Sequence, residues 1–495
     1  GGTSPGGRRR PVRHGRLVTP GPAVGRSTDG STGGAGRHLV VVGGGVTGLA
    51  AAWEASARAD VAVTVLEASV RLGGKVRTSA IDLPGGPRTV DEGADNFLAR
   101  VPDAVELCVE LGLEDQLIEP AIGRAAVWAR GAVRPYPTRH VLGVPLDADE
   151  LARTGIVSDD AVRAVAGEVD STDPAPPDDV AIGAFIGGRF GREVVEHLVG
   201  PLVGGINAGD VDELSLRAVT PQLAAAAADG ASLTLALRHR LAAAPPSGPV
   251  FRALAGGTAT LVDTLADRLR ERGAGIHTST AVTGLGATTD GRIAVTVADR
   301  PALVADSVVV AAPAPTAAEL VGDLSPAAAA QLRRIVHVPV AFVTVALDAS
   351  RVTVPEGLSG VLVPRDAGLL ATAVSFGSRK WPHWSDGAHT VLRVAVGHRH
   401  DDRPADLDDD ELVAAVRADL STVLGVGVAP VAARVSRWSP GFAQYQVGHL
   451  ELVGRIRSAL GADAPAVRVV GADLGGLGLP ACIAQGRGAS RELLF

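Results

Sequence analysis

The chain has 495 residues, of which 46% are hydrophobic and 20% charged, and its formal net charge is −7. This composition excludes a disordered chain and gives no support to a nucleic-acid-binding protein, while the length suits two or three domains. No apolar run reaches the roughly 20 residues of a transmembrane helix. The two cysteines, Cys108 and Cys482, are too few for a disulfide framework or a cysteine zinc cluster. We therefore expect a globular protein of a reducing compartment, the cytoplasm.

Residues 1–36 are expected to form a disordered tail. They consist mainly of Gly, Pro, Ser, Thr and Arg, and they contain almost no large apolar residue that could join a core. The arginines are not followed by the apolar segment of a signal peptide. The tail is either a loose basic arm or the result of a mispredicted start codon, and we favour the second interpretation.

The stretch 38–67 has the pattern of a dinucleotide-binding unit. HLVVVGGG (38–45) is typical of a buried parallel strand that ends in a tight turn, and an alanine-rich helix follows over 46–59. A second strand, VAVTVLE (61–67), ends in Glu67. Strand, turn, helix, strand and acid in this order are far more specific than a glycine motif alone.

Each glycine of Gly43-x-Gly45-x-x-Gly48 has a separate physical role. Gly43 permits the turn, Gly45 lets the backbone approach a pyrophosphate, and Gly48 lets helix and strand pack closely. The amides at the helix start favour the phosphate charge, and Glu67 accepts hydrogen bonds from ribose hydroxyls. The sequence therefore predicts a bound dinucleotide.

A second glycine pair lies in RLGGKVRT (71–78), directly after this unit. A nicotinamide-only domain does not need such a pair with flanking cations. The whole run, VVGGGVTGLAAAWEA…VTVLEASVRLGGKVRT, resembles the flavin amine oxidase and protoporphyrinogen oxidase superfamily, in which this segment continues along the diphosphate of FAD. The resemblance implies FAD as the cofactor, with Arg71, Gly74 and Lys75 beside the diphosphate.

The next segments begin the part of the chain that would surround a substrate. A short hairpin-like piece (81–100) contains Asp91 to Asn96, and an amphipathic helix is expected over 101–120. Val105, Cys108, Val109 and Leu113 lie near one face of that helix. We expect Cys108 to pack in the core rather than to act as a nucleophile. Residues 127–145 follow as two strands around a turn at Arg130-Gly131, and acid-rich turns then separate helical pieces, among them 179–199.

The sheet pattern returns at residue 251, and the last strand, within 467–494, belongs beside the first in a doubly wound sheet. The predicted fold class is therefore α/β: a Rossmann-like FAD-binding sheet assembled from separated segments, with a strand-rich substrate domain and a helical insertion. The expected parts are 37–120, 251–320 and 465–495 for the FAD-binding domain, 121–250 for substrate-side strands and the helical insertion, and 321–464 for the substrate-binding domain.

Three late segments indicate which branch of this superfamily the chain resembles. RKWPHWSDGAHTVLRVAVG, VSRWSPGFAQYQVGH and GADLGGLGLPACIAQGRGA resemble the oxygen-dependent porphyrinogen oxidases of haem synthesis, in the soluble form of Gram-positive, GC-rich bacteria. Amine oxidases share the first and last pieces of the chain but not RKWPHW or QYQVGH. The resemblance covers roughly residues 38–494. It implies a porphyrinogen substrate that a flavin oxidises, with O2 as the electron acceptor and H2O2 as a product.

The resemblance also implies which residues contact FAD. They are Gly43, Gly44, Gly45, Val46, Thr47, Gly48, Glu67, Ala68, Lys75, Gly93, Ala94, Asp95, Asn96, Val282 on the adenine side, Trp438 near the flavin, and Leu477, Gly478 and Leu479 at the isoalloxazine. Two positions depart from the family. Ala481 stands where relatives often carry an acid, so we expect a different cap at the last helix. Asp95 stands where some relatives have an arginine, so the charge on the pyrimidine side differs.

The implied chemistry resides in the flavin, and we assign no catalytic side chain. Arg100 and Arg124 are candidates for binding substrate propionates, since a guanidinium matches a carboxylate bidentately; solvated surface arginines are the alternative. Arg130, Arg134 and Arg139 lie near them in sequence. His398 and His400 come closest to a metal cluster, with Asp401 and Asp402 beside them, but a polar loop explains this group as well. We therefore assign no metal and no histidine base.

The expected activity is oxidation of coproporphyrinogen III to coproporphyrin III, with protoporphyrinogen IX as the near alternative substrate. An amine oxidase or carotenoid desaturase of the same superfamily is a further alternative, as is a flavin-binding protein without turnover. A downstream haem-pathway enzyme that receives the product is the expected protein partner.

Overall fold

The computed structural model describes Gly1 and residues 36–243 and 248–494. Residues 37–495 form one compact unit, which is separate from residues 1–36. The tail predicted for residues 1–36 lies outside the described residues except for its two ends. In the described parts of the chain, no helix combines the length and the apolar content that a membrane span requires.

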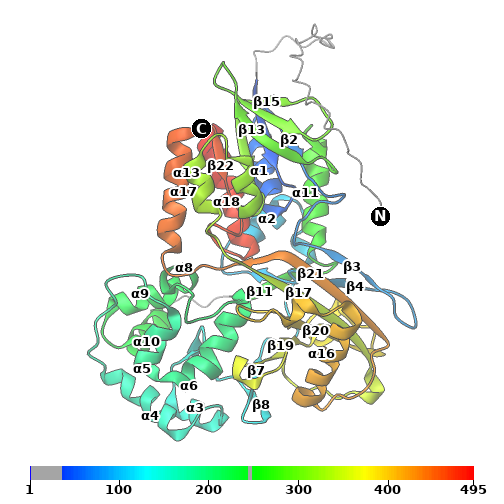
Figure 1. The fold of residues 1–495 in the computed structure, drawn as a ribbon. Helices are drawn as coiled ribbons and strands as arrows, with labels where there is room; N and C mark the ends of the chain where they lie inside the picture. Colours follow the sequence, from blue (N-terminus) through cyan, green and yellow to red (C-terminus); the bar gives the residue numbers. More distant parts are fainter. Residues whose placement is uncertain (2–35, 244–247, 495) are drawn as a thin grey trace. The chain divides into compact units, whose positions relative to one another are not determined.

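A five-stranded parallel sheet forms the first layer of the compact unit (Figure 1). Its order is β12-β2-β1-β16-β22, and each neighbouring pair is parallel. The strands are β1 (Arg37–Val42), β2 (Val61–Leu66), β12 (Gly275–His277), β16 (Ser307–Val310) and β22 (Val467–Val469). Runs of Val and Leu form these strands because both faces of the sheet are covered. Three stretches far apart in the sequence thus supply one sheet.

Different elements cover the two faces of the parallel sheet. On one face lie α1 (Val46–Ser56), α11 (Ala259–Glu271) and α18 (Leu479–Leu494). On the other lie α12 (Ala314–Leu320), α13 (Pro326–Leu332), α17 (His449–Asp463) and the meander β13 (Val282–Ala287), β14 (Ile293–Val297) and β15 (Leu303–Ala305). Gly486 of α18 packs directly on α1, since a Cβ there would lie 2.1 Å from the Thr47 carbonyl oxygen. The predicted doubly wound α/β sheet from separated segments is confirmed.

A seven-stranded mixed sheet forms the strand-rich part, in the order β21-β17-β20-β19-β18-β7-β8. Its strands are β7 (Ala125–Ala129), β8 (Ala132–Pro135), β17 (His337–Asp348), β18 (Gly360–Leu362), β19 (Ala371–Ser375), β20 (His389–Val396) and β21 (Ala432–Ala443). Helix α16 (Asp409–Leu424) packs on the face that carries Val343 and Val345. Because strand residues alternate between faces, Val340 and Phe342 lie on the opposite face, which we call the inner face. The register places Trp438 and Arg393 on the inner face as well.

Residues 148–243 form the helical part of the chain. Its helices are α3 (Ala148–Thr154), α4 (Asp159–Gly167), α5 (Ile182–Phe190), α6 (Arg192–Val194), α7 (Gly205–Asn207), α8 (Leu216–Val219), α9 (Pro221–Asp229) and α10 (Leu233–Ala243), with a π-helical segment at Val195–Gly204. The helical piece expected over 179–199 is broken at Gly191, whose φ of 84° ends α5. Pro201 lies within the π-helical segment, where its nitrogen has no hydrogen to donate to a helical hydrogen bond.

The helix expected over 101–120 is much shorter than predicted. Helix α2 spans Asp103–Glu110 and is followed by Gly112 at φ +76°. Cys108 is buried, as predicted, but Val109 is 48% exposed, so the prediction was wrong for Val109. The remaining short strands are β3 (Thr78–Ile81), β4 (Arg88–Asp91), β5 (Phe97–Leu98), β6 (Leu117–Ile118), β9 (His140–Val141), β10 (Val144–Pro145) and β11 (Phe251–Leu254). The domain boundaries given above stay a prediction.

Candidate functional site

The turn between β1 and α1 is shaped by its three glycines. Gly43 has a φ of +107°, and a Cβ there would lie 2.6 Å from the Ala311 carbonyl oxygen. A Cβ at Gly48 would lie only 2.0 Å from the Gly43 carbonyl oxygen, so helix and turn touch through backbone atoms. Gly45 differs from both, because no atom lies within 4 Å of a Cβ built there. No side chain caps α1, so its first amides border this open space.

The second glycine pair lies beside the first turn. Gly73 donates its amide to the Gly44 carbonyl oxygen at 2.8 Å, and Gly45 and Gly73 form a parallel bridge. A Cβ at Gly74 would lie 3.4 Å from the Gly45 Cα. We call Gly43–Gly48 together with Gly73 and Gly74 the glycine cradle. Arg71 donates to the Leu72 and Gly74 carbonyl oxygens at 3.0 and 2.6 Å, so it holds the second turn of the cradle in place.

Glu67 lies at the edge of the glycine cradle, directly after β2. One carboxylate oxygen accepts from the Gly44 amide at 2.6 Å, and the other accepts from the amide of Ser69 at 2.8 Å and from its hydroxyl at 2.6 Å. The Glu67 carbonyl oxygen accepts from the Thr280 amide at 2.8 Å, so the start of β13, with Val282, runs past the same place. Ala68 follows Glu67 on this edge. The half-buried carboxylate is thus fixed next to the open space at Gly45.

A loop after β4, Gly93–Asn96, packs on the end of the cradle segment. A Cβ at Gly93 would lie 2.1 Å from the Lys75 carbonyl oxygen and 3.4 Å from the Trp438 ring. The Trp438 Nε1 donates to the Glu92 carbonyl oxygen at 3.2 Å. The Ala94 carbonyl oxygen accepts from the Thr258 hydroxyl at 2.7 Å. The structure therefore brings Lys75, Trp438 and this loop into contact.

Lys75 is an exposed residue whose ammonium end is partly buried. Its ammonium donates to the Gly441 carbonyl oxygen of β21 at 2.6 Å. Burial lowers the pKa of Lys75, although Asp473 opposes that effect.

Asp95 is the centre of a buried charge cluster behind the loop. Its carboxylate lies 3.0 Å from the Arg393 guanidinium and 3.3 Å from the Lys380 ammonium, and it accepts from the Trp381 Nε1 at 2.9 Å. The Asn96 amide donates to it at 2.6 Å. Burial by itself would raise the pKa of Asp95, but the two cations outweigh it and hold that pKa well below its usual range.

Sequence reasoning missed the partners of Asp95. Lys380 and Trp381 belong to RKWPHW, which was noticed only as a family signature, and Arg393 is in β20. A signal was available for Lys380, because the chain has only one other lysine, Lys75.

The loop between β22 and α18 carries Leu477, Gly478 and Leu479. The Tyr445 hydroxyl fixes this loop by donating to the Ala472 carbonyl oxygen at 2.5 Å and accepting from the Gly476 amide at 2.6 Å. Asp473 accepts from the Ala314 amide at 2.6 Å and pairs with the His337 Nε2 at 2.8 Å.

Ala481 and Cys482, near the start of α18, lie beside the loop between β22 and α18. A Cβ at Gly476 would meet the Ala481 Cβ at 2.6 Å, so the small side chain of Ala481 lies tight against the loop. Burial raises the pKa of the Cys482 thiol to about 11, so this thiol is protonated at neutral pH.

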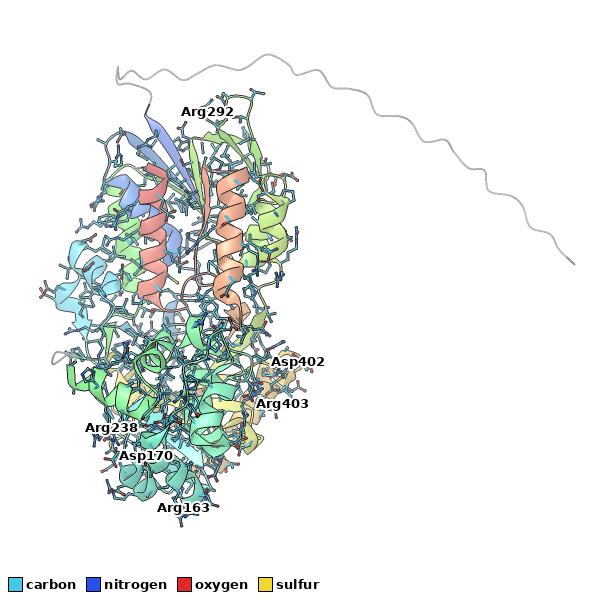
Figure 2. The ribbon with its side chains drawn as sticks, turned by 90° about the vertical axis from the view of Figure 1, so that its left-hand side faces the viewer. Arg163, Asp170, Arg238, Arg292, Asp402 and Arg403 are labelled. Carbon is cyan, nitrogen blue, oxygen red and sulfur yellow. The ribbon has the colours of Figure 1, made fainter. Side chains whose placement is uncertain are left out.

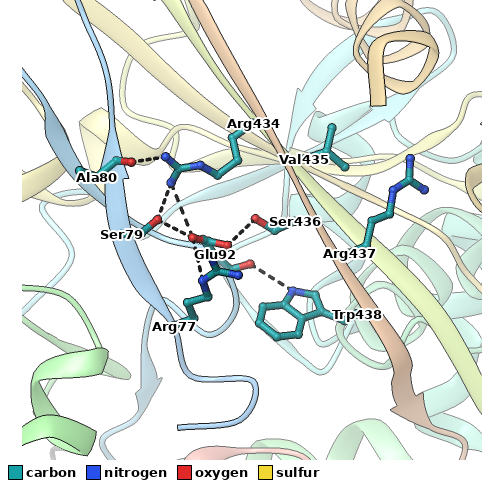
Figure 3. Close-up of a pocket in the computed structure, with 9 residues that line it drawn as sticks. All are labelled: Arg77, Ser79, Ala80, Glu92, Arg434, Val435, Ser436, Arg437 and Trp438. Carbon is teal, nitrogen blue, oxygen red and sulfur yellow. Dashed lines mark hydrogen bonds and ion pairs between the residues drawn. The ribbon is translucent and has the colours of Figure 1, made fainter. Parts of the chain in front are cut away.

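A polar cleft lies beside the Gly93–Asn96 loop, and Figure 3 shows the residues that line it. Its volume is about 440 Å³. Glu92 lies within it, 3.1 Å from the Arg77 guanidinium, and accepts from the Ser436 hydroxyl at 3.0 Å. Arg434 donates to the Ser79 hydroxyl at 2.6 Å. The cleft thus joins β21 to the β3–β4 hairpin, and Trp438 is the one predicted site residue that lines it.

The five arginines of the predicted substrate region differ in their partners. Arg130 donates to the Val157 carbonyl oxygen at 3.3 Å, Arg134 to that of Ala129 at 3.1 Å, and Arg139 pairs with Asp147 at 2.9 Å. Arg100 and Arg124 are exposed, and within the described residues their side chains have no hydrogen bond or ion pair. Arg100 also lines a cleft of about 330 Å³ that includes Val105, Val109 and Arg252.

His398 and His400, considered above as metal ligands, have structural partners, and so does the buried His449. His400 lies 2.5 Å from Glu213, and His398 lies 3.5 Å from Asp401, which also pairs with Arg403 at 2.6 Å. Figure 2 labels Arg403 and the neighbouring Asp402. The ring of His449 stacks on Tyr445 at 4.0 Å, and burial lowers the pKa of His449 to about 4. Among the described residues, no group of three or more His, Cys, Asp and Glu side chains could hold a metal ion.

Comparison with known proteins identifies the family. Residues 46–494 match the family described as flavin containing amine oxidoreductase. The chain belongs to this family, and it is an oxidoreductase. It is 36% identical to a protein of Mycobacterium tuberculosis named coproporphyrinogen III oxidase, over 91% of this chain and 96% of that protein. It is 32% identical to the Bacillus subtilis protein of the same name, over 92% of this chain and 98% of that protein.

Solved structures of other proteins have a similar fold. A crystal structure named "Putative protoporphyrinogen oxidase from Exiguobacterium sp. 255-15" is 31% identical to this chain, with a TM-score of 0.83 over 92% of this chain and 98% of that one. Cyclohexylamine oxidase from Brevibacterium oxydans is 19% identical, with a TM-score of 0.66 over 92% and 98% of the two chains, so its likeness concerns the fold alone.

Proposed function

We propose that this protein binds FAD without a covalent link and oxidises coproporphyrinogen III to coproporphyrin III, with O2 as the electron acceptor and H2O2 as a product. The observation that carries the proposal is the match to proteins named coproporphyrinogen III oxidase over nearly the whole length of both chains. A flavin dinucleotide suits the site, since the open space at Gly45 lies between uncapped helix amides and the Glu67 carboxylate.

The dinucleotide would be held largely by backbone atoms. The amides at the start of α1 would bind the pyrophosphate, and Glu67 would accept hydrogen bonds from the ribose hydroxyls. The remaining contacts are proposed for Ala68, Arg71, Gly74, Lys75, Gly93, Ala94, Asp95, Asn96, Val282, Trp438, Leu477, Gly478 and Leu479. When bound, the flavin supplies the two-electron chemistry that oxidises the substrate and is reversed by O2. Cys482 stays a buried, protonated thiol, which supports a cofactor without a covalent link.

The side chains would bind and orient the substrate. Val340 lies opposite Trp438 on the inner face of the mixed sheet, and Phe442 packs in the same apolar cluster, which would suit a flat macrocycle. Arg100 and Arg124 are exposed and without partners among the described residues, so they are free to pair with propionates. Coproporphyrinogen III presents four propionates to these two arginines, and protoporphyrinogen IX presents two.

Protoporphyrinogen IX is the second candidate substrate. It is favoured by the name of the Exiguobacterium structure and by a rice protein named chloroplastic protoporphyrinogen oxidase, which is 27% identical over 85% of this chain. Hand-over of the product to a downstream haem-pathway enzyme and a cytoplasmic location also stay proposals.

The test compares initial rates of porphyrin formation from the two porphyrinogens, followed by fluorescence under identical detergent and oxygen, with peroxide release from an amine as the third arm. We expect a kcat/KM about ten- to a hundredfold higher for coproporphyrinogen III, since ordering and desolvation offset much of the gain from its two further carboxylates. A kcat/KM that favours protoporphyrinogen IX would select the second candidate. Peroxide release from the amine alone would contradict both.

A further inference from the structure

The two lysines of the chain occupy comparable positions. Among 47 Lys and Arg residues, only residues 75 and 380 are lysine, and both ammonium groups lie beside the segments that contact the Gly93–Asn96 loop. Lys75 donates to a backbone carbonyl oxygen, whereas Lys380 lies against the carboxylate of Asp95. A chain that uses arginine almost everywhere else thus has compact, unbranched cations at this loop.

The charges around Asp95 do not cancel. One carboxylate lies between two cations, Arg393 at 3.0 Å and Lys380 at 3.3 Å, and the side chains of all three are at most 17% exposed. The Trp381 and Asn96 groups that also bind Asp95 are neutral donors. The cluster therefore holds one net positive charge in a poorly solvated place, where charge acts over a longer range than in water.

The position of this charge is fixed by the fold. The Arg393 guanidinium donates to the Gly93 carbonyl oxygen at 2.8 Å and lies over the Phe342 ring at 4.9 Å. The Lys380 ammonium lies over the Trp381 ring at 4.9 Å. The loop thus has the cation pair on one side, while Gly93 lies against Lys75 and Trp438, next to the proposed flavin.

We propose that Lys380, held by Asp95, is a positioning residue that places one positive charge behind the Gly93–Asn96 loop and thereby stabilises the negative charge that the flavin ring gains on two-electron reduction. Transfer of a hydride to the flavin N5 leaves that negative charge on the pyrimidine part of the ring, so a nearby fixed cation favours the reduced form. This inference rests on the proposed binding of FAD, and it assigns the cluster a role beyond holding the loop.

The test uses the FAD-loaded protein and sulfite, whose sulfur adds to the flavin N5 and leaves the same negative charge on the ring without turnover. Lys380→Gln should weaken sulfite binding about tenfold, and Lys380→Arg should stay within about threefold of the wild type. Asp95→Asn removes a negative charge instead, so it should strengthen sulfite binding several-fold. A cluster that only supports the loop would weaken binding in both the Gln and the Asn variants.

The control is Arg139→Gln, which removes a positive charge from an exposed ion pair and should leave sulfite binding unchanged. FAD content, measured on each purified variant, separates the two proposals. A wild type that binds no FAD would overturn the proposed cofactor, whereas FAD-loaded Lys380→Gln with wild-type sulfite affinity would overturn the role of Lys380. If Asp95→Asn does not retain FAD, the two Lys380 variants decide the question by themselves.

Discussion

The glycine cradle and the Asp95 cluster meet at the same loop, yet they are built in opposite ways. The cradle is made of backbone atoms, and its first turn takes six consecutive residues, Gly43–Gly48. The Asp95 cluster is made of charged side chains from distant segments, since Asp95 and Lys380 are 285 residues apart. The cradle leaves an open space at Gly45, while the cluster is closed and almost fully paired.

The two regions would therefore serve different purposes: the cradle binds the cofactor, and the cluster sets the charge near it. A backbone cradle gives a dinucleotide its shape and its hydrogen bonds, and it cannot be adjusted without changing the fold. A side-chain cluster can change the charge near the cofactor while the fold stays intact. Substitutions in the cradle should therefore abolish cofactor binding or folding, and substitutions elsewhere should have graded effects.

The largest effects are expected from two glycines of the cradle. Gly48→Ala should lower the free energy of unfolding by about 3 kcal/mol or more, because its Cβ would meet a backbone oxygen at 2.0 Å that cannot move freely.

Gly45→Val should keep the wild-type melting temperature without cofactor and lose FAD binding, since its side chain would fill the open space. Thermal unfolding of the apoproteins and FAD titration measure both outcomes. A Gly45→Val variant that still binds FAD would contradict the proposed binding of FAD in the glycine cradle.

Acid should destabilise the protein through His449. Burial lowers its pKa from 6.5 to about 4, so the folded state favours the neutral ring. Stability from this group is complete above the unfolded pKa of 6.5 and is lost as pH falls from there toward 4, by about 3 kcal/mol in total. His449→Phe keeps the stack on Tyr445 and should show a smaller loss over that pH window in urea unfolding. Equal pH dependence of the two proteins would count against this explanation.

Removal of the Glu67 carboxylate should weaken FAD binding without abolishing it. In Glu67→Gln one oxygen remains, while the charge that favours two ribose hydroxyl donors is gone, so we expect a loss of about 1–2 kcal/mol. Titration of apoprotein with FAD gives the affinity, and Glu271→Gln, an exposed residue paired with Arg268 at the end of α11, is the control. Unchanged FAD affinity in Glu67→Gln would show that the ribose hydroxyls do not bind to Glu67.

The smallest effects are expected from the exposed arginines. Arg100→Gln and Arg124→Gln should each raise the KM for coproporphyrinogen III about three- to tenfold with little change in kcat, because each would remove one propionate partner. The wild-type KM should also rise with salt. Arg139→Gln, already paired with Asp147, should behave as wild type. A KM insensitive to both substitutions would place the propionates elsewhere.

Features that depend on neighbouring residues could be predicted from the sequence. The strand, turn and helix around Gly43–Gly48 follow from local steric rules, and the late strand at 467–469 follows from its hydrophobic run before a glycine-rich turn. Val109 was placed wrongly because periodicity did not show that α2 ends at Glu110, before Gly112 turns the chain.

Features that depend on side chains meeting across the fold could not be predicted. Lys380 and Arg393 reach Asp95 only after the mixed sheet has formed, and the His337–Asp473 pair joins residues 136 positions apart. Likewise, nothing in the local sequence distinguishes Arg139, which is paired with Asp147, from Arg124, whose side chain has no partner among the described residues. The positions of charges near the site are therefore the part that required a structure.

The most direct test of the account is the state of the flavin in the purified protein. We predict a yellow protein from which acid precipitation releases all the flavin as free FAD, in a ratio of about one per chain, and a folded Gly45→Val variant that contains none. Flavin that stays with the precipitated protein, or a folded wild type that takes up no FAD, would contradict a noncovalent dinucleotide in the glycine cradle.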